Sequence, residues 1–132
     1  MAFKNDKYVD LAIAAQTYVG NAEKEEMLLR SYFTELDDHK RARFFLMQQV
    51  CYMYYATLFF KLADKHLPID QLHNADMNVP DLADFRAMLG KGTVSLGTYE
   101  GLLNYGKVLF ATLTKNLKSD KFAWAIALMT YA

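Results

Sequence analysis

The sequence contains little cysteine and little proline, and it has no net charge. Cys51 is its only cysteine, and two prolines occur in 132 residues. No disulfide can therefore form within the chain, and few positions interrupt a helix. Lysine plus arginine and aspartate plus glutamate number 15 each, so the formal charge is zero. A balanced chain offers no basic stripe to a phosphate backbone, and we expect no nucleic-acid partner.

A targeting segment is also missing from the beginning of the sequence. The first ten residues, MAFKNDKYVD, contain no apolar signal core and no cleavage site. The lone Cys51 lies in the most apolar stretch, where we expect a buried hydrophobe in a reducing compartment. These features predict a cytoplasmic protein. Its length predicts a single domain over residues 1–132, with a core large enough to need neither a metal nor a disulfide.

A long hydrophobic run is the next absence. The greasiest segment, RFFLMQQVCYMYYATLFFKLA, has 17 uncharged residues between Arg43 and Lys61. A membrane span needs about 20 apolar residues, and this run contains Gln48 and Gln49 as well as tyrosines at its middle. We therefore expect no membrane contact. Apolar residues recur at helical spacing nearly all round, so the segment predicts a central buried helix over about 39–66, surrounded by other helices.

Helix start and stop signals divide the rest of the chain. Capping residues, glycines and prolines favour a first helix from Asn5 or Asp6 to Gly20, a second after Asn21, and a junction near 36–38. Pro68 is expected to end the central helix, and one helical turn is predicted over Ile69–His73. Pro80 suits the first turn of a short helix ending at Gly90, Thr98 opens the next, and Ser119 caps a last helix over 121–131. The predicted fold class is all-α, an irregular bundle of five to six helices around the central one.

The last predicted helix, KFAWAIALMTYA, is apolar on all sides. Alanines at 123, 125 and 127 allow neighbours to approach closely. Two interpretations remain open: the helix is buried at the centre of the bundle, or it forms a contact with another subunit.

The sequence contains residues of the types that bind metals or catalyse reactions, but not at the spacing that a metal site or an active site requires. The segment DKHLPIDQLHNAD carries Asp64, His66, Asp70, His73 and Asp76, which are suitable ligand types for zinc or iron. No paired spacing fixes their geometry, so an acidic surface loop is expected and no metal or other cofactor is assigned. No nucleophile, base or phosphate-binding motif stands out either, and the sequence predicts no catalytic residue and no enzyme.

The remaining features favour a non-enzymatic protein-interaction module, of the class of inhibitors, immunity proteins or phage anti-defence proteins. Its partner would be another protein, or a second copy in a homodimer. Carboxylates would meet a basic surface and the last helix an apolar one. The residues assigned to partner binding are Asp64, Asp70, Asp76, Asp81, Asp84, Trp124 and Met129. The alternative is a bundle that holds haem, a metal or a nucleotide among Tyr52, Tyr54, Tyr55, Tyr99 and Tyr105.

Overall fold

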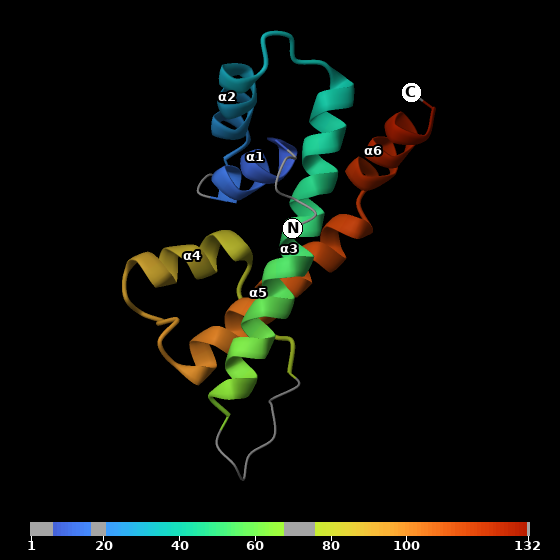
Figure 1. Ribbon diagram of the computed structural model, residues 1–132. Coiled ribbons are helices and arrows are strands. Elements are labelled where there is room, and N and C mark those ends of the chain that lie inside the picture. The colour runs from blue at the N-terminus through green and yellow to red at the C-terminus, as the bar shows by residue number, and fades with distance from the viewer. Residues whose placement is uncertain (1–6, 17–20, 68–75, 132) are drawn as a thin grey trace. The chain divides into compact units, whose positions relative to one another are not determined.

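The computed structural model describes residues 7–16, 21–67 and 76–131, and that part of the chain is all-helical with no strand (Figure 1). The predicted all-α class is therefore confirmed, as is a central helix that contacts several others. That helix, α3, spans 38–65, one residue from the predicted bounds at each end. The helices are α1 (Lys7–Ala15), α2 (Ala22–Tyr32), α3 (Asp38–Lys65), α4 (Leu82–Gly90), α5 (Tyr99–Leu117) and α6 (Asp120–Tyr131).

Residue contacts divide the chain into two compact units. Unit 1 comprises Met1–Cys51 and Asn116–Ala132, and unit 2 comprises Tyr52–Lys115. Helix α3 contributes its first part to unit 1 and its second part to unit 2. The single domain over 1–132 stays a prediction.

In unit 1, the first part of α3 lies between two sets of helices. Phe44 joins a buried cluster with α1 and α2, while Phe45 joins a second cluster with α6. Adjacent side chains leave a helix about 100° apart, so consecutive phenylalanines serve two different clusters. The first cluster contains Tyr8, Leu11, Ala15, Leu29, Phe33 and Phe44; the second contains Ala42, Phe45 and Ala125, with Phe122, Leu128 and Met129 packed against it.

The predicted junction between α2 and α3 is confirmed. Asn21 caps α2, because its side-chain oxygen accepts a hydrogen bond from the Lys24 amide at 3.0 Å. The helix ends at Tyr32, and Phe33 is extended. Asp37 then accepts from the Lys40 amide at 2.8 Å, which satisfies a free donor at the start of α3. Short polar side chains thus fix both helix starts.

In unit 2, α5 packs on the second part of α3 through a buried cluster that includes Ala63, Leu102 and Leu103. Gly106 permits this approach, since a Cβ atom there would lie 2.7 Å from Cδ1 of Phe60. Tyr105 packs against both Phe59 and Phe85, with ring centroids 4.6 and 5.4 Å away. The second of these contacts holds α4 to α5.

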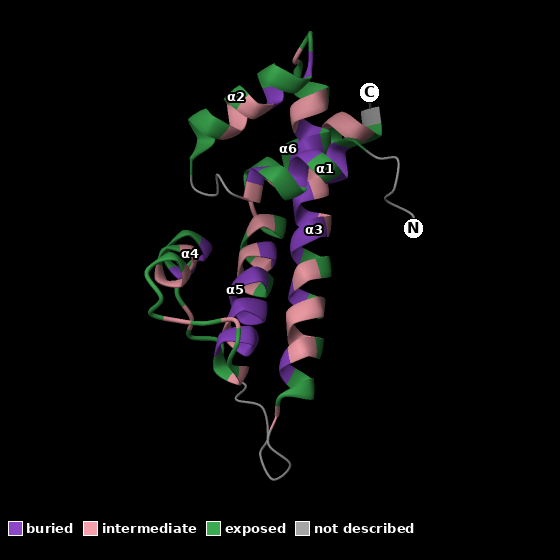
Figure 2. Cartoon of the chain, turned by 60° about the vertical axis from the view of Figure 1, so that its left-hand side comes forward, coloured by how far each residue is buried: buried purple, intermediate pink, exposed green. Residues whose placement is uncertain are grey.

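The second part of α3 is not buried on every side. Met53 is 54% exposed and Tyr54 is 49% exposed, and Figure 2 shows exposed and intermediate stretches along this part of the helix. Residues such as Tyr52, Ala56 and Ala63 face inward. The predicted central helix with neighbours on several sides is confirmed, but this part of it keeps an exposed side, because apolar composition does not by itself bring a neighbour to each face.

Two helix starts refine the predicted bounds. Helix α4 begins at Leu82, and Asp81 caps it, because the Asp81 side chain accepts a hydrogen bond from the Asp84 amide at 2.8 Å. Pro80, which was expected in the first turn, precedes the helix. Ser119 caps α6 as predicted, accepting from the Phe122 amide at 3.2 Å. The predicted signals at Asn5, Asp6, Gly20, Pro68 and 69–73 lie outside the described residues.

Candidate protein-interaction surface

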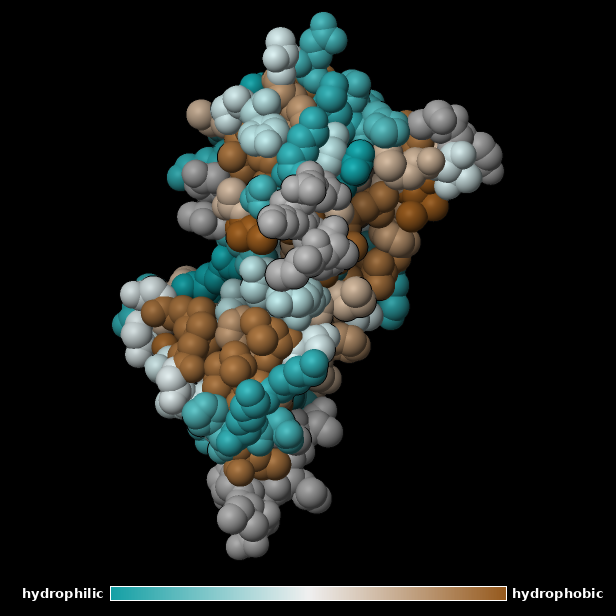
Figure 3. All heavy atoms as spheres, viewed as in Figure 1, coloured by the Kyte–Doolittle hydropathy of each residue, from teal (hydrophilic) through white to brown (hydrophobic). Residues whose placement is uncertain are grey.

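Helix α6 packs on unit 1 with one side and shows apolar residues on the other. Ala125 is fully buried in the cluster around Phe45. Trp124 is 36% exposed and Ile126 is 43% exposed. Figure 3 shows hydrophobic residues along the surface of this helix. We name the exposed side the α6 outer face, formed by Ala123, Trp124, Ile126, Ala127 and Thr130.

Small residues run along the middle of the α6 outer face. Ala123 and Ala127 are four residues apart and so share one side of the helix. Thr130 follows, and its hydroxyl donates to the Ile126 carbonyl at 2.8 Å, which turns the polar group back onto the helix. Trp124 and Ile126 stand on either side of this strip. The arrangement allows another backbone to approach between two larger apolar side chains.

The structure corrects one of the two interpretations of the last helix. Central burial is excluded by the exposure of Trp124 and Ile126, whereas Ala125 on the other side of α6 packs in the cluster around Phe45. Of the alanines, Ala125 serves the core, whereas Ala123 and Ala127 face outward. A contact with another molecule stays a prediction.

Charge is confined to the beginning of α6. Asp120 and Lys121 occupy its first turn, and no residue from 122 to 131 is ionisable as an acid or base near neutral pH. The Lys121 ammonium lies 4.8 Å from the Phe45 ring centroid. Burial raises the pKa of Glu25 on α2, while the Lys121 charge and a hydrogen bond with Gln48 oppose that rise. These groups join α2, α3 and α6 beneath the α6 outer face.

A hydrogen-bonded pair of side chains, Gln49 of α3 and Asn116 of α5, also holds the end of α5 in unit 1. Gln49 is 4% exposed, and its amide group donates to the Phe45 carbonyl at 3.0 Å. Its side-chain oxygen accepts from the Asn116 amide group at 3.0 Å. Both the oxygen and the nitrogen of this buried side chain therefore have a hydrogen-bond partner.

The two α6 residues predicted to bind a partner have different surroundings. Trp124 lies on the α6 outer face, whereas Met129 packs partly buried against the cluster of Ala42 and Phe45. Met129 therefore contributes to holding α6 rather than to the outer face. Ile126 and Thr130 are the members of the face that the sequence did not single out, since direction around α6 depends on tertiary contacts.

The predicted acidic residues belong to unit 2 and have separate local roles. Asp64 and Asp84 are exposed. Asp81 caps α4, and Asp76 accepts from the Asn78 amide at 2.9 Å. Asp70 lies outside the described residues. No finding tests their role in partner binding.

A buried lysine in unit 2 was not anticipated. Lys107 is 4% exposed on α5, and its ammonium donates to the Asp76 carbonyl at 2.6 Å. Arg86 of α4 likewise donates to the Tyr105 hydroxyl of α5 at 3.1 Å. Both contacts fasten neighbouring segments to α5. In the sequence, the position of Lys107 on an otherwise apolar side of its helix was the signal that could have predicted its burial. Its hydrogen-bond partner could not be predicted in the same way, because Asp76 is 31 residues away in sequence.

The tyrosines of the predicted ligand site have different surroundings, and no finding tests that site. The Tyr105 ring is enclosed by Phe59 and Phe85. Tyr54 is about half exposed and lies edge-on to Tyr55, with centroids 5.3 Å apart. Side chains therefore occupy the space beside Tyr105 that a ligand would need.

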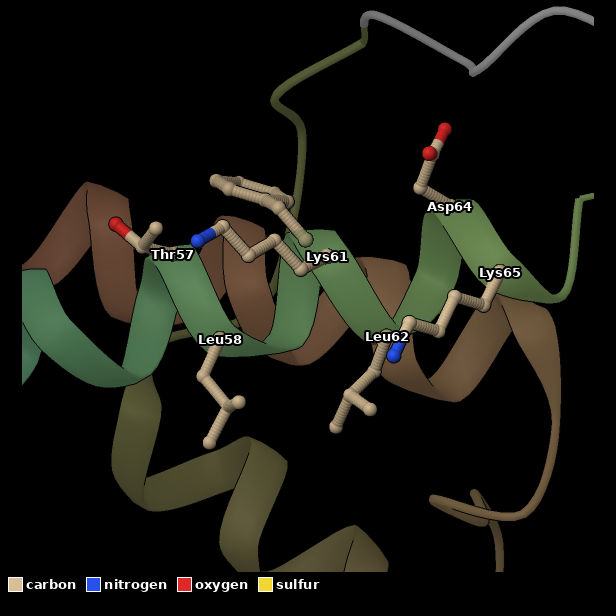
Figure 4. A pocket seen from close by; sticks show the side chains of 7 residues that line it. Thr57, Leu58, Lys61, Leu62, Asp64 and Lys65 are labelled. Atoms are coloured by element: carbon tan, nitrogen blue, oxygen red, sulfur yellow. The ribbon is translucent and has the colours of Figure 1, made fainter.

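A surface hollow of about 580 Å³ lies along the second part of α3 (Figure 4). Leu58 and Leu62 point to one side of the helix and Asp64 to the opposite side, with Lys61 and Lys65 between them. All lining side chains among the described residues belong to this one helix. Ligand sites bury most of a small molecule between elements, so this hollow lacks the enclosure expected of one.

Metal-ligating side chains form no cluster among the described residues. No group of three or more His, Cys, Asp or Glu side chains there is placed to hold a metal ion, while Asp70 and His73 lie outside that part. Cys51 is buried as predicted, and burial raises the pKa of its thiol, which disfavours the reactive thiolate. Within the described helices, none combines the length and apolar character needed to cross a membrane.

No protein-family model, curated protein or solved structure matches this chain.

Proposed function

We propose that this protein acts without catalysis, by binding another protein through the α6 outer face. The supporting observation is the exposure of Trp124 and Ile126 on a helix side that carries no charge along ten residues. Tryptophan is among the residues most enriched at energetically important interface positions. Uncharged, partly exposed apolar residues of this kind are typical of the centre of an interface.

The shape of the face favours an apolar helix as the matching element. Ala123 and Ala127 let a partner backbone approach, and Trp124 and Ile126 would pack along its flanks. Leu117, at the end of α5 and also in unit 1, is a further apolar residue that is 44% exposed. An inhibitor-type role in the cytoplasm is the class that we assign, since such proteins work by surface contact alone.

The size of the face sets the strength of binding. A helix of 12 residues is about 18 Å long. One side of it buries only a few hundred Å², below the roughly 800 Å² per partner of a standard interface. We therefore propose a transient complex unless the partner also covers adjoining residues such as Leu117.

Two matched isoleucines provide the test. Ile126 on α6 and Ile13 on α1 are each 43% exposed, and both belong to unit 1. The wild-type chain, Ile126→Glu and Ile13→Glu would be used to capture partners from cells that make the protein, followed by a binding titration with the purified partner. A glutamate at the interface must be desolvated, so Ile126→Glu is expected to weaken binding at least about tenfold.

Ile13→Glu is the control and should bind like the wild type, while circular dichroism verifies that both variants remain helical. Equal loss of binding in the two variants would move the interface away from α6. Full binding by Ile126→Glu would refute the proposal. Sedimentation of the purified chain alone identifies the case in which the partner is a second copy.

A further inference from the structure

Three cationic side chains gather over two adjacent aromatic rings of unit 1, away from α6. The ring centroids of Tyr8 and Phe33 are 5.6 Å apart. The Lys7 ammonium lies 5.9 Å from the first centroid and 5.2 Å from the second. The Arg43 guanidinium is 4.4 Å from Tyr8, and the Lys40 ammonium is 5.7 Å from Phe33. We call these three side chains the cation cluster.

Significant cation–π contacts occur about once per 70–80 residues, so four on neighbouring rings are a local concentration. Like charges repel, and the negative faces of the rings offset part of that repulsion. Lys40 is also fixed by Asp37 at 3.6 Å and by a hydrogen bond to the Glu35 carbonyl at 2.7 Å. Lys40 is thus held in place before any partner arrives, which lowers the entropy cost of binding.

The cluster comes from both helices that meet there. Lys7 belongs to α1, while Lys40 and Arg43 belong to the first turns of α3. Lys7 and Arg43 are exposed, whereas Tyr8 and Phe33 are 5% and 8% exposed. A partner would therefore contact the cationic groups, with the rings beneath them as support.

We propose that the cation cluster binds a short carboxylate-rich segment of a partner protein. Each guanidinium or ammonium group donates hydrogen bonds that carboxylates accept, and arginine can take a carboxylate in a bidentate geometry. The cluster packs on the α1 and α2 side of α3, whereas α6 packs on the side of Phe45. This surface is therefore separate from the α6 outer face, and either proposal can fail alone.

A nucleic acid suits the cluster less well than an acidic peptide. A duplex carries one charge per about 1.7 Å and requires a row of cations along its backbone. The three cations form a compact group over two neighbouring rings and not such a row. The rings are covered, so they provide no platform on which bases could stack.

Fluorescence anisotropy with a labelled oligoglutamate peptide, at low and physiological salt, tests this proposal on the full chain. Removing both exposed cations in the variant Lys7→Gln with Arg43→Gln is expected to weaken binding about tenfold. The control, Lys24→Gln with Lys118→Gln, removes the same charge from exposed positions and should change binding less than about twofold. Arg43→Lys keeps the charge and should retain most of the affinity.

Circular dichroism establishes that each variant is folded before binding is compared. A wild-type chain that does not bind the peptide, or an equal loss in the control, overturns the proposal. So does tighter binding of a single-stranded oligonucleotide of the same charge, which would make nucleic acid the partner. Loss confined to the cluster variant supports it, irrespective of the result at Ile126.

Discussion

Helices α5 and α6 follow each other in the chain and differ in how they use apolar residues. Nine of the 19 residues of α5 are buried, including Leu109, which is fully buried. In α6, Ala125 is the buried residue among positions 120–130, although the helix has no charge after Lys121. Figure 2 shows the buried stretch of α5 in purple. The helix with fewer charges is the less buried one.

The difference shows that the pattern around a helix decides burial more than its apolar content does. Along α5, Glu100, Asn104 and Lys115 lie outside a wide buried side, which contains Lys107 and packs on α3. Along α6, apolar residues occur on every side, and the side of Phe122, Ala125 and Met129 is the one that packs on Phe45 of α3. An all-round apolar helix with one covered side leaves the other for a partner.

The largest predicted effect contrasts one aliphatic residue on each helix. Leu109→Ala on α5 should lower the free energy of unfolding by about 2–5 kcal/mol, because it empties a fully buried site. Ile126→Ala on α6 should lower it by less than about 1 kcal/mol, since that side chain is 43% exposed. Urea denaturation followed by circular dichroism measures both. Equal losses would mean that the outer face of α6 is covered after all.

A second comparison uses substitutions that enlarge a side chain, one on α5 and one on α6. A Cβ atom at Gly101 on α5 would overlap the backbone carbonyl of Ser95, so Gly101→Ala should cost about 1–3 kcal/mol. Ala127→Leu on α6 adds more atoms at an exposed position and should alter stability by no more than about 0.5 kcal/mol. Thermal unfolding of the two variants gives the comparison. A silent Gly101→Ala would show that the turn before α5 adjusts freely.

The smallest effect concerns the charge beneath α6 and depends on pH. Burial raises the pKa of Glu25 above its ordinary 4.5, so its ionised form opposes folding as pH rises through the folded pKa. Glu25→Gln should therefore raise the melting temperature at neutral pH, and the gain should vanish below 4.5.

Glu26 is the control with the opposite sign. Its hydrogen bond with Arg41, 2.7 Å long, lowers the pKa of this carboxyl group. Its stabilising contribution is present above its ordinary pKa and is lost as pH falls through the folded value. Glu26→Gln should thus lower the melting temperature at neutral pH, with convergence in acid. Parallel pH profiles for the two variants would contradict both assignments.

Local signals predicted most of the architecture. Asn21 caps α2, Ser119 caps α6, and the junction before α3 lies where Asp37 bonds to the Lys40 amide. Such contacts join residues three positions apart, so the sequence contains both partners in one window. Asp81 rather than Pro80 begins α4 because a capping carboxylate satisfies free amides that proline does not.

The candidate sites were less predictable. Trp124 and Met129 were predicted together to bind a partner, yet Trp124 is exposed whereas Met129 packs inward, and no finding tests the role of either. No residue of the cation cluster was identified, because Lys7 and Arg43 approach Tyr8 only when α1 folds against α3. Pairing of this kind joins segments far apart in the chain.

The order of residues alone determined an all-helical chain, a long helix near 39–66 and the ends of most helices, because hydrogen bonds and caps in helices act over three or four residues. Only the tertiary structure decided which side of each helix is covered. That choice depends on contacts between distant segments, such as Phe45 with Ala125 and Phe60 with Gly106. It left the outer side of α6 exposed and brought three cations to the rings of Tyr8 and Phe33.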